Sequence, residues 1–431
     1  MASGGDTIAA IATAPGRGGV AVVRVSGPDA FYVAERLSGH AVEPGRIFWR
    51  RLRSPDERVL DEAVVLAFKA PRSYTGEDVV EFQCHGGSVT PHRVLEACYA
   101  LGARPARRGE FTERAFLNGR VDYSQAESVL NLVDARTARA ADSALEGLSG
   151  RRRREKGEFY ALALDLSSTM EHALDVEEGE LGDAFFDGLR RLAAALSERL
   201  SAAIRRVREG RMLRDGALVV LAGAPNAGKS SLMNALLDES RAIVSDTPGT
   251  TRDAIEAWID LDGWPVRLVD TAGLRTSEDS IEAEGVRRAE ELIARADIVL
   301  ALDCEPESVN GRVLRLHAKC DLGHCKRGLN VSSKTGEGLD ELKQAVVSSL
   351  EVLADDSAFD AADASVGEES LAAYLDAKTL IDGIASSSGT FDMVLAANAA
   401  RSAAEKLAAA VGATYSDDIL DRLFSRFCVG K

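Results

Sequence analysis

The first 120 residues alternate short apolar runs with turns that contain glycine and proline. β-rich runs cover residues 20–25, 62–68 and 78–84, and apolar positions recur at helical spacing over 91–101. No phosphate-binding loop accompanies these elements in the sequence. The pattern predicts an α/β module at residues 1–120.

Two later stretches have helical periodicity instead. The first runs from residue 124 to about 211 and is rich in Ala, Leu, Glu and Arg, and the second covers about 366–422. An acidic, Ala/Ser-rich segment at 355–369 reads as a linker or a frayed helix start. We expect two helical parts, 121–214 and 351–431, that pack together as one bundle, with a domain inserted between them at 215–350.

The inserted domain begins with the most specific motif of the chain. Residues 223–230 read G-A-P-N-A-G-K-S and follow the apolar run 217–222. A buried strand that leads through a glycine-rich turn into a helix directs backbone N–H groups and a helix N-terminus toward phosphate oxygens. Lys229 can reach the β- and γ-phosphates, and the Ser230 hydroxyl is a suitable Mg²⁺ ligand. The sequence therefore predicts a P-loop with Lys229 as a catalytic residue.

Two further phosphate-site elements follow in order. Thr250 and Thr251 lie about twenty residues downstream, where a Thr hydroxyl can complete the Mg²⁺ shell and sense the γ-phosphate. The apolar run at 266–269 ends in D-T-A-G, which places the Asp270 carboxylate near Mg²⁺ and the Gly273 N–H near the γ-phosphate. The predicted Mg²⁺ ligands are Ser230 and Thr251. The predicted phosphate-side residues are Asn226, Ala227, Gly228, Lys229, Ser230, Ser231, Ser245, Asp246, Thr247, Pro248, Gly249, Thr250, Thr251, Asp270, Thr271, Ala272 and Gly273.

The base-reading motif is less complete. GTPases usually bind guanine through a carboxylate in an N-K-x-D motif, and residues 318–321 read A-K-C-D. Asp321 can accept from the paired donors of guanine, which adenine lacks on that edge, so GTP is favoured over ATP. The S-S-K sequence at 332–334 matches the loop whose backbone usually contacts the base. The predicted base-side residues are Lys319, Asp321, Ser332, Ser333 and Lys334, with Ala318 where an Asn is expected.

Composition narrows the class of protein. The formal net charge of −16 argues against a general nucleic-acid binder, because non-specific affinity comes from neutralising phosphates. No apolar run approaches the ~20 residues that span a membrane, and the N-terminus lacks a signal pattern. Six cysteines without paired spacing fit a reducing compartment. We expect a cytoplasmic protein without a membrane segment.

Two clusters suggest alternative sites. Arg104, Arg107 and Arg108 form a basic cluster, and a second at 151–156 is expected to be a solvated helix face. His317, Cys320, His324 and Cys325 invite a zinc interpretation. Their spacing fits no common zinc site and overlaps the base-reading loop, so incidental side chains are expected there.

Several blocks outside the nucleotide domain resemble one known family. They read DTIAAIAT at 6–13, PGRGG at 15–19, VRVSG at 23–27, YTGEDVVEFQCHGG at 74–87, GEFTERAFLNG at 109–119 and FCVGK at 427–431. These blocks resemble the MnmE (TrmE) family of tRNA-modification GTPases, over residues 6–431. The resemblance implies an α/β multidomain fold: an N-terminal α+β domain for folate binding and dimerisation, a discontinuous helical bundle and an inserted Ras-like P-loop GTPase domain.

The resemblance also implies a reaction. Such proteins act with the FAD-containing partner MnmG, as a heterotetramer, on C5 of the wobble uridine of certain tRNAs. They add an aminomethyl or carboxymethylaminomethyl group, and 5-formyltetrahydrofolate or a related tetrahydrofolate supplies the one-carbon unit. K⁺ and dimerisation of the GTPase domains activate GTP hydrolysis, so a homodimer is implied.

Residue roles follow from the same resemblance. The implied K⁺ ligands are Asn226, Ser245, Thr247 and Thr250, and a cation there can supply the charge that an arginine finger gives elsewhere. Glu282 matches the family's candidate for orienting the attacking water, the alternative being a surface helix carboxylate.

The family's folate-contacting positions fall on Arg24, Glu81 and Arg120, and Lys431 belongs to the same region. An Arg suits the glutamate tail of a folate, and a carboxylate suits the pterin N–H edge. The family often has Lys where Arg120 stands, which changes donor geometry. Cys428 is either an accessible thiol near positive charge or a buried small hydrophobe. The resemblance favours the first, as a catalytic residue near the folate.

This chain departs from the family pattern at several points. Ala318 replaces the base-reading Asn. Only about eight residues separate the strand that ends at Asp303 from the one that begins near Arg312, which is too few for a crossover helix. Residues 355–388 also diverge. Two alternatives remain: a folate-binding scaffold for MnmG with a weakened GTPase switch, and a ribosome-assembly GTPase, which would predict neither the folate module nor FCVGK.

Overall fold

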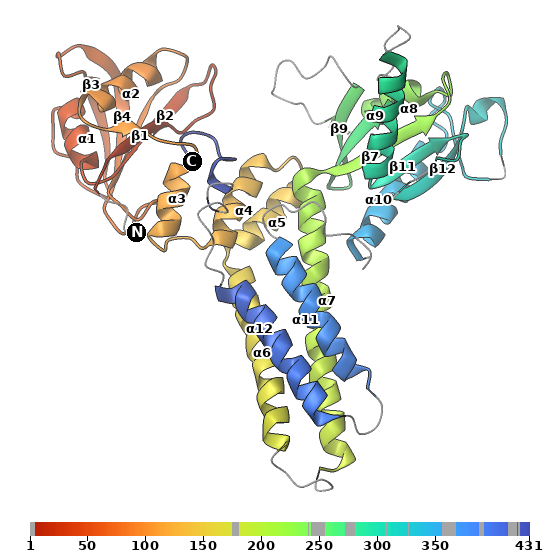
Figure 1. Ribbon diagram of the computed structural model, residues 1–431. Coiled ribbons are helices and arrows are strands. Elements are labelled where there is room, and N and C mark those ends of the chain that lie inside the picture. The colour runs from red at the N-terminus through yellow and green to blue at the C-terminus, as the bar shows by residue number, and fades with distance from the viewer. Residues whose placement is uncertain are drawn as a thin grey trace. The chain divides into compact units, whose positions relative to one another are not determined.

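The computed structural model describes residues 5–174, 181–239, 241–242, 255–271, 281–306, 309, 311–325, 327–355, 368–387, 392–412, 420 and 423–431. The chain forms two compact units (Figure 1): the first contains residues 1–130, 147–150 and 414–431, and the second contains 131–146 and 151–413. Among the described helices, none combines the length and the apolar character that crossing a bilayer requires.

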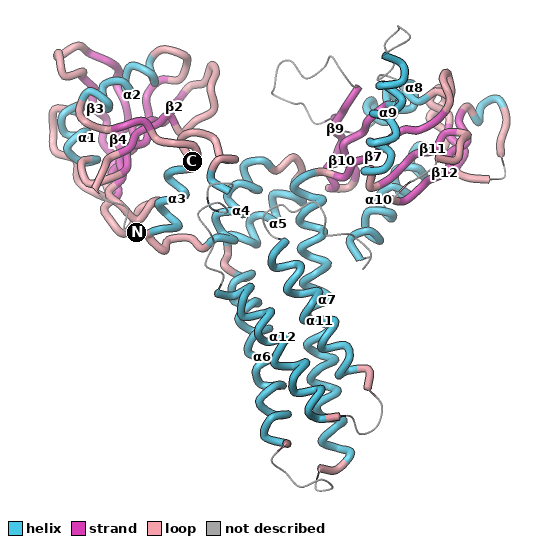
Figure 2. The backbone as a smooth tube through the Cα atoms, viewed as in Figure 1, coloured by secondary structure: helices cyan, strands magenta, loops and turns pink. Residues whose placement is uncertain are grey.

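The first unit is built on a six-stranded sheet that is antiparallel except for its last pair. The strand order is β3 (Ile47–Arg53), β4 (Val59–Phe68), β5 (Val79–His85), β2 (Val20–Ser26), β1 (Ile8–Ile11) and β6 (Arg104–Pro105). Helices α1 (Ala30–Ser38) and α2 (Thr90–Ala100) pack against the sheet (Figures 1 and 2). Alternate strand residues such as Val23 and Val25 join Leu37 and Val94 in its core.

Periodicity predicted three strands and one helix of this unit, but neither the seven-residue β3 nor the nine-residue α1. The runs at 20–25, 62–68 and 78–84 lie in β2, β4 and β5, and the helix predicted over 91–101 is α2. Strands β1 and β6 are four and two residues long, which is too short for an alternating pattern to identify them.

The C-terminal residues 423–431 also belong to the first unit. They pack on α3 (Glu110–Leu117): the Phe424 ring lies 6.3 Å from that of Phe116, and the N–H of Phe111 donates to the carbonyl oxygen of Lys431 at 3.2 Å. The expected second helical part, 351–431, thus ends in a segment that packs on the N-terminal unit.

Four long helices form a bundle in the second unit. They are α6 (Arg151–Ala173), α7 (Asp183–Asp215), α11 (Glu368–Ala385) and α12 (Met393–Gly412), preceded by α4 (Tyr123–Asp134) and α5 (Ala138–Leu148). The bundle core contains Leu196 and Ala400, and the rings of Phe159 and Tyr374 meet edge to face at 5.7 Å. Helices from before and after the nucleotide domain pack together (Figure 1), which confirms the predicted discontinuous bundle.

Helix α7 leads through Gly216 into β7 (Ala217–Gly223), the central strand of a seven-stranded sheet. The strand order is β13 (Leu329–Val331), β12 (Arg312–Ala318), β11 (Ile298–Leu302), β7, β10 (Trp264–Asp270), β9 (Ile255–Leu261) and β8 (Arg241–Ala242). The first five strands are parallel, and β9 is antiparallel to both neighbours. The domain also contains α8 (Lys229–Glu239), α9 (Ile281–Arg295) and α10 (Leu339–Asp355), which completes the predicted P-loop α/β architecture. Between β11 and β12, the described residues 303–306, 309 and 311 contain no helix, in line with the short crossover.

Candidate functional site

The P-loop lies at a switch point of the second sheet. From β7 the chain first builds β8 to β10 on one side and then crosses to β11 on the other. Ligands of open α/β sheets bind outside the carboxyl ends of the strands at such a point. Residues 223–230 begin at that end of β7 and lead into α8, in the strand–turn–helix arrangement that the motif requires.

Lys229 is held inside the P-loop. Its side chain is buried, and Nζ donates to the carbonyl oxygens of Gly223 at 2.8 Å and Ala224 at 2.9 Å. A buried ammonium needs such acceptors, because an unpaired charge away from water is costly. Asn226, at φ +63°, is in the left-handed region of backbone conformation, within the turn of the P-loop. The P-loop therefore holds the positive charge of Lys229 against its own backbone carbonyl oxygens.

Ser230 and Asp270 meet at the edge of this loop. The Ser230 hydroxyl donates to Oδ2 of Asp270 at 2.5 Å, and Asp270 is fully buried at the end of β10. The next residue, Thr271, donates from Oγ1 to the carbonyl oxygen of Leu221 in β7 at 2.8 Å. These bonds hold the hydroxyl and the carboxylate side by side, which suits Mg²⁺ with Ser230 as a direct ligand and Asp270 acting through water.

The base-side residues converge on the same end of the sheet. Nζ of Lys319 donates to the carbonyl oxygen of Asn226 at 3.1 Å, across the P-loop. Oδ1 of Asp321 accepts from Oγ of Ser332 at 2.7 Å, which joins the two predicted base-reading loops. The second loop is a tight turn, in which Lys334 N–H donates back to Ser332 Oγ at 3.3 Å. The Ser332 hydroxyl thus orients the Asp321 carboxylate through Oδ1, one of the two oxygen atoms that can accept hydrogen bonds.

Other predicted nucleotide residues complete these loops. Ala227 packs against the core below the P-loop, Gly228 at φ +100° follows it, and Ser231 lies exposed in the first turn of α8. Ser333 lies in the turn between Ser332 and Lys334.

Part of the predicted site lies outside the described residues. This part comprises Ser245, Asp246, Thr247, Pro248, Gly249, Thr250, Thr251, Ala272 and Gly273. Glu282 lies in α9, but its side chain is likewise outside the described part.

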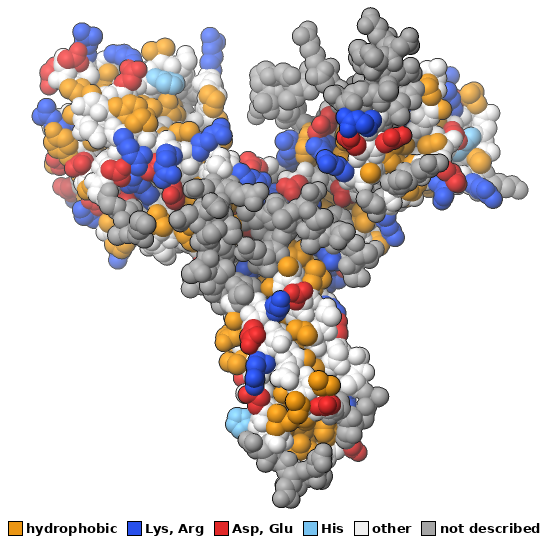
Figure 3. Space-filling model, viewed as in Figure 1, with side chains coloured by type: hydrophobic (Ala, Val, Ile, Leu, Met, Phe, Trp, Pro, Cys, Tyr) orange, Lys and Arg blue, Asp and Glu red, His pale blue; other side chains and the backbone are white. Residues whose placement is uncertain are grey.

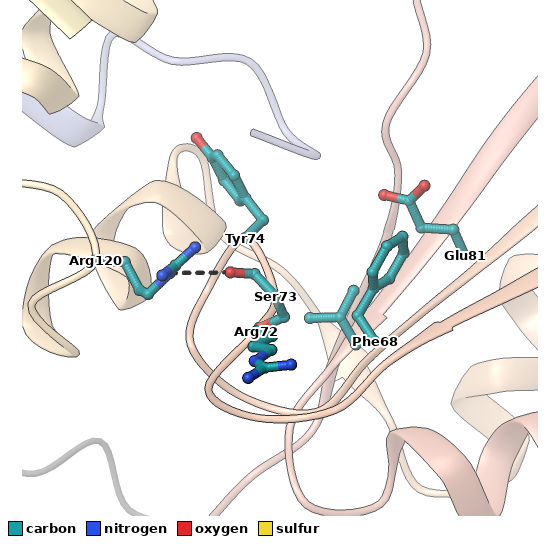
Figure 4. Close-up of a pocket in the computed structure, with 7 residues that line it drawn as sticks. Phe68, Arg72, Ser73, Tyr74, Glu81 and Arg120 are labelled. Atoms are coloured by element: carbon teal, nitrogen blue, oxygen red, sulfur yellow. Dashed lines mark hydrogen bonds between the residues drawn. The ribbon is translucent and has the colours of Figure 1, made fainter. Parts of the chain in front are cut away.

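A second candidate site lies in the first unit. A cavity of about 390 Å³ is lined by Phe68, Arg72, Ser73, Tyr74, Val79, Glu81 and Arg120 (Figure 4). Ligand pockets commonly have about 300–1,000 Å³ and combine apolar walls with a few polar groups. Nε of Arg120 donates to the carbonyl oxygen of Ser73 at 3.1 Å, which holds its guanidinium at the edge of the cavity (Figure 4).

Arg24 connects this cavity with the C-terminal tail. Its Nε donates to Oε1 of Glu81 at 2.8 Å, and its Nη1 donates to the carbonyl oxygen of Gly430 at 3.4 Å. The guanidinium also lies over the rings of Tyr74 and Phe111, 5.3 and 5.5 Å from their centroids. Three of the predicted folate residues are therefore brought to one region, with Arg24 beside Glu81 and Arg120 across the cavity.

The tail places Cys428 and Lys431 against the same unit. Cys428 is exposed, and its carbonyl oxygen accepts from the N–H of Gly109 at 3.4 Å. Gly430 has φ +100°, and a Cβ there would lie 2.3 Å from the carbonyl oxygen of Ile11 in β1. Only glycine lets the tail run this close to the sheet.

The basic cluster expected at Arg104 and Arg107 is instead an ion-pair network. Arg104 pairs with Asp6 and Glu110, Arg107 pairs with Glu113, and buried Arg114 pairs with Glu110. On the visible face of the first unit, Lys and Arg side chains lie among Asp and Glu (Figure 3). Burial raises the pKa of Glu110, but hydrogen bonds and charge from the surrounding arginines outweigh it and lower that pKa to about 2. Asp6 lies 98 residues from Arg104 in the sequence, so sequence spacing did not reveal this pair, whereas Glu110 and Glu113 follow the arginines closely.

The fold and the phosphate-site geometry define a P-loop GTPase with an additional N-terminal α+β unit and a helical bundle. The chain matches the family models described as GTP-binding protein TrmE N-terminus, over residues 7–120, and MnmE helical domain, over residues 123–428. It belongs to the MnmE family of tRNA modification GTPases.

Relatives with the name tRNA modification GTPase MnmE match over nearly their whole length. The protein of Alkalilimnicola ehrlichii is 40% identical over 447 residues, which cover 99% of each chain. That of Methylorubrum populi is 43% identical over 440 residues, 99% of this chain and 98% of the relative. That of Geobacter sulfurreducens is 39% identical over 455 residues, 99% of each chain. This membership rules out the ribosome-assembly alternative.

Proposed function

We propose that this chain is a K⁺-activated GTP hydrolase that acts with MnmG on tRNA. The pair would add an aminomethyl or carboxymethylaminomethyl group at C5 of the wobble uridine, with a tetrahydrofolate as one-carbon donor. The observation that carries the proposal is the presence of two separate sites in a single MnmE-family chain. One is the P-loop with Lys229 and the Ser230–Asp270 pair, and the other is the cavity lined by Glu81 and Arg120, with Arg24 paired to Glu81.

GTP and Mg²⁺ would bind at the P-loop. Lys229 would neutralise phosphate charge, since its ammonium needs only to exchange the carbonyl oxygens of Gly223 and Ala224 for phosphate oxygens. Ser230 and Thr251 would ligate Mg²⁺, and Asp321 would read guanine. A hard cation with oxygen ligands fits the paired hydroxyl and carboxylate at Ser230 and Asp270.

K⁺ would bind beside the phosphates through Asn226, Ser245, Thr247 and Thr250. Asn226 supports this assignment because it is an exposed residue of the P-loop itself. The cation would supply positive charge to the transition state, and Glu282 would orient the attacking water.

The cavity of the first unit would bind 5-formyltetrahydrofolate or a related tetrahydrofolate. Aromatic walls from Phe68 and Tyr74 fit a flat pterin, Glu81 would accept from its N–H edge, and Arg120 would pair with a carboxylate of the glutamate tail. Lys431 would add positive charge. Cys428, exposed at the tail, would act as a catalytic residue there.

The assembly would be a homodimer that joins FAD-containing MnmG in a heterotetramer in the cytoplasm. The tRNA would be held largely by the complex, because this chain carries a net charge of −16.

GTP turnover in KCl and in NaCl at equal ionic strength tests the proposal. We expect turnover in KCl to exceed that in NaCl by at least about tenfold, since the cation supplies transition-state charge. Turnover that is equally low in both salts, with folate binding retained, would favour the scaffold alternative that Ala318 motivates. A deletion strain with an unchanged profile of wobble-uridine modification would contradict the role in tRNA modification.

A further inference from the structure

Three metal-binding side chains converge beside the base-reading loops. Cys320 is buried, His324 and Glu337 are exposed, and one ligand atom from each lies within 4.8 Å of the other two. A ring nitrogen of His324 (Nε2) lies 2.8 Å from Oε1 of Glu337. Cys320 and His324 are close in sequence, whereas Glu337 comes from a different loop. Sequence spacing alone therefore pointed to His317 and Cys325 as the companions of these two residues and did not indicate Glu337.

Hydrogen bonds on both sides of His324 fix the backbone of the first loop, residues 319–325. Nε2 of His317 lies 3.1 Å from the carbonyl oxygen of Gly323. The side-chain amide of Asn330 binds the backbone of Cys325 twice, accepting from N–H at 2.7 Å and donating to the carbonyl oxygen at 3.0 Å. His324 thus lies between two residues whose backbones are already fixed.

The second loop, residues 332–338, also has a backbone fixed by hydrogen bonding and close packing, and it carries Glu337. The N–H of Ser332 donates to the carbonyl oxygen of Glu337 at 2.9 Å, which closes the turn. Gly338 has φ +76°, and a Cβ there would lie 1.9 Å from the carbonyl oxygen of Asn330. The turn therefore returns tightly onto β13, and this return sets Glu337 opposite Cys320 and His324.

We propose that Cys320, His324 and Glu337 bind a Zn²⁺ ion that joins the two base-reading loops. Thiolate, imidazole and carboxylate are the donors that Zn²⁺ takes in proteins, and a water molecule completes a tetrahedral shell. Binding displaces the thiol proton of Cys320, which is released to solvent, and uses the neutral form of His324. His317 is not a ligand, because its two ring nitrogens face Asp303 and Gly323.

The proposed metal site lies next to the guanine-reading residue Asp321. Asp321 follows Cys320 directly, and Ser332, which orients Asp321, is bonded to Glu337 through its backbone. A metal bridge between the loops would hold Asp321 in its guanine-reading position, where Ala318 offers no polar side chain to do so. The proposal goes beyond the GTPase function, since metal binding itself needs no nucleotide.

Metal binding is tested on the full-length protein, stripped of metal and titrated with Co²⁺ in the absence of nucleotide. Tetrahedral Co²⁺ with a thiolate ligand gives a near-ultraviolet charge-transfer band, which we expect to saturate at one metal per chain and to disappear on adding Zn²⁺. Cys320→Ser should abolish the band. Glu337→Gln alters an exposed side chain and leaves the Cys320 thiol in place, and it should weaken Co²⁺ affinity by at least about tenfold.

Cys325→Ser is the matched control, because this neighbouring thiol is exposed and lies outside the cluster. It should leave the band and the affinity unchanged. A missing band in the unaltered protein, or an unchanged titration in Glu337→Gln, would overturn the proposed site.

The effect on the base-reading loops is measured with a fluorescent GDP analogue at constant Mg²⁺. We expect Zn²⁺ to tighten binding by about tenfold in the unaltered protein and in Cys325→Ser, and not in Glu337→Gln. Equal affinity with and without bound Zn²⁺ would overturn the bridging role. If the chain lacked GTPase activity in KCl but still gave the Co²⁺ band, the proposed function would fail and the metal site would stand.

Discussion

Nζ of Lys319 donates to the backbone carbonyl oxygen of Asn226 at 3.1 Å and so joins the base-reading motif to the P-loop. The Lys319 stem also passes over the loop: the atom nearest to a Cβ built on Gly228 is Cε of Lys319, at 3.9 Å. The phosphate and base halves of the nucleotide site therefore share one side chain. Ala318 has no polar side chain that could add a second hydrogen bond between these loops, as an Asn could, so their alignment depends more on the Lys319 contact.

Replacing Lys319 by Met tests this contact. Met keeps the apolar stem but removes the donor, so we expect about tenfold weaker binding of GTP and GDP. Fluorescence titration with nucleotide analogues measures the change. Lys343→Met, a Lys in α10 that pairs with Asp340, is the control and should bind as the unaltered protein does. Equal affinities for both variants would remove Lys319 from the site.

Asp321→Asn should change the base that is bound. An amide cannot accept from both guanine donors, but it can donate to the additional carbonyl oxygen of xanthine. We expect GTP affinity to fall by at least about 100-fold and XTP affinity to rise. Competition between GTP and XTP for the same site measures both. A variant that still prefers GTP would show that another group reads the base.

Lys229→Ala should abolish GTP hydrolysis and leave folate binding intact. The buried ammonium is the positive charge of the P-loop, and its loss should lower kcat by at least about 100-fold. Turnover in KCl and tetrahydrofolate titration of the same preparation give the two readouts. Loss of both activities in a folded variant would contradict two independent sites.

Gly430→Ala should weaken folate binding without changing GTP turnover. A Cβ at this position would lie 2.3 Å from the Ile11 carbonyl oxygen, so the tail must move away from Arg24. We expect at least about tenfold weaker tetrahydrofolate binding by calorimetry. Gly102→Ala is the matched control, since Gly102 has the same φ of +100° and nothing within 4 Å of the added Cβ. An equal loss in both variants would mean that backbone strain, and not tail displacement, is responsible.

Glu110 should make the first unit sensitive to acid. Because its pKa is lowered from 4.5 to about 2 in the folded state, its ion pairs stabilise the fold fully above pH 4.5. That contribution, at most about 3 kcal/mol, is lost as the pH falls from about 4.5 to 2. Glu110→Gln should be less stable at neutral pH and should lose less stability over this range.

Hydrogen exchange of the α3 amides between pH 2 and 6, corrected for intrinsic rates, measures this local stability. Glu113→Gln is the control, since among the described residues Glu113 pairs only with the largely exposed Arg107. A parallel pH dependence for Glu110→Gln and the unaltered protein would place the acid sensitivity in other groups.

Much of the fold could be predicted because it is encoded locally. The P-loop is eight consecutive residues, and the long helices and strands carry their own periodicity, so each is recognisable without its neighbours. Strands β1, β3 and β6 were missed, because β1 and β6 are too short for an alternating pattern and only one residue of β3 is buried.

The candidate sites divide in the same way. The sequence by itself determined the P-loop, Asp270, the Asp321 base motif and the family to which the chain belongs, since each depends on residue types at short spacing. Only the tertiary structure decided that Lys319 reaches Asn226, that Glu337 meets Cys320 and His324, and that the tail lies beside Arg24. The physical reason is that strand pairing and the folding back of loops bring together side chains that are far apart in the sequence, and no local sequence pattern links such residues.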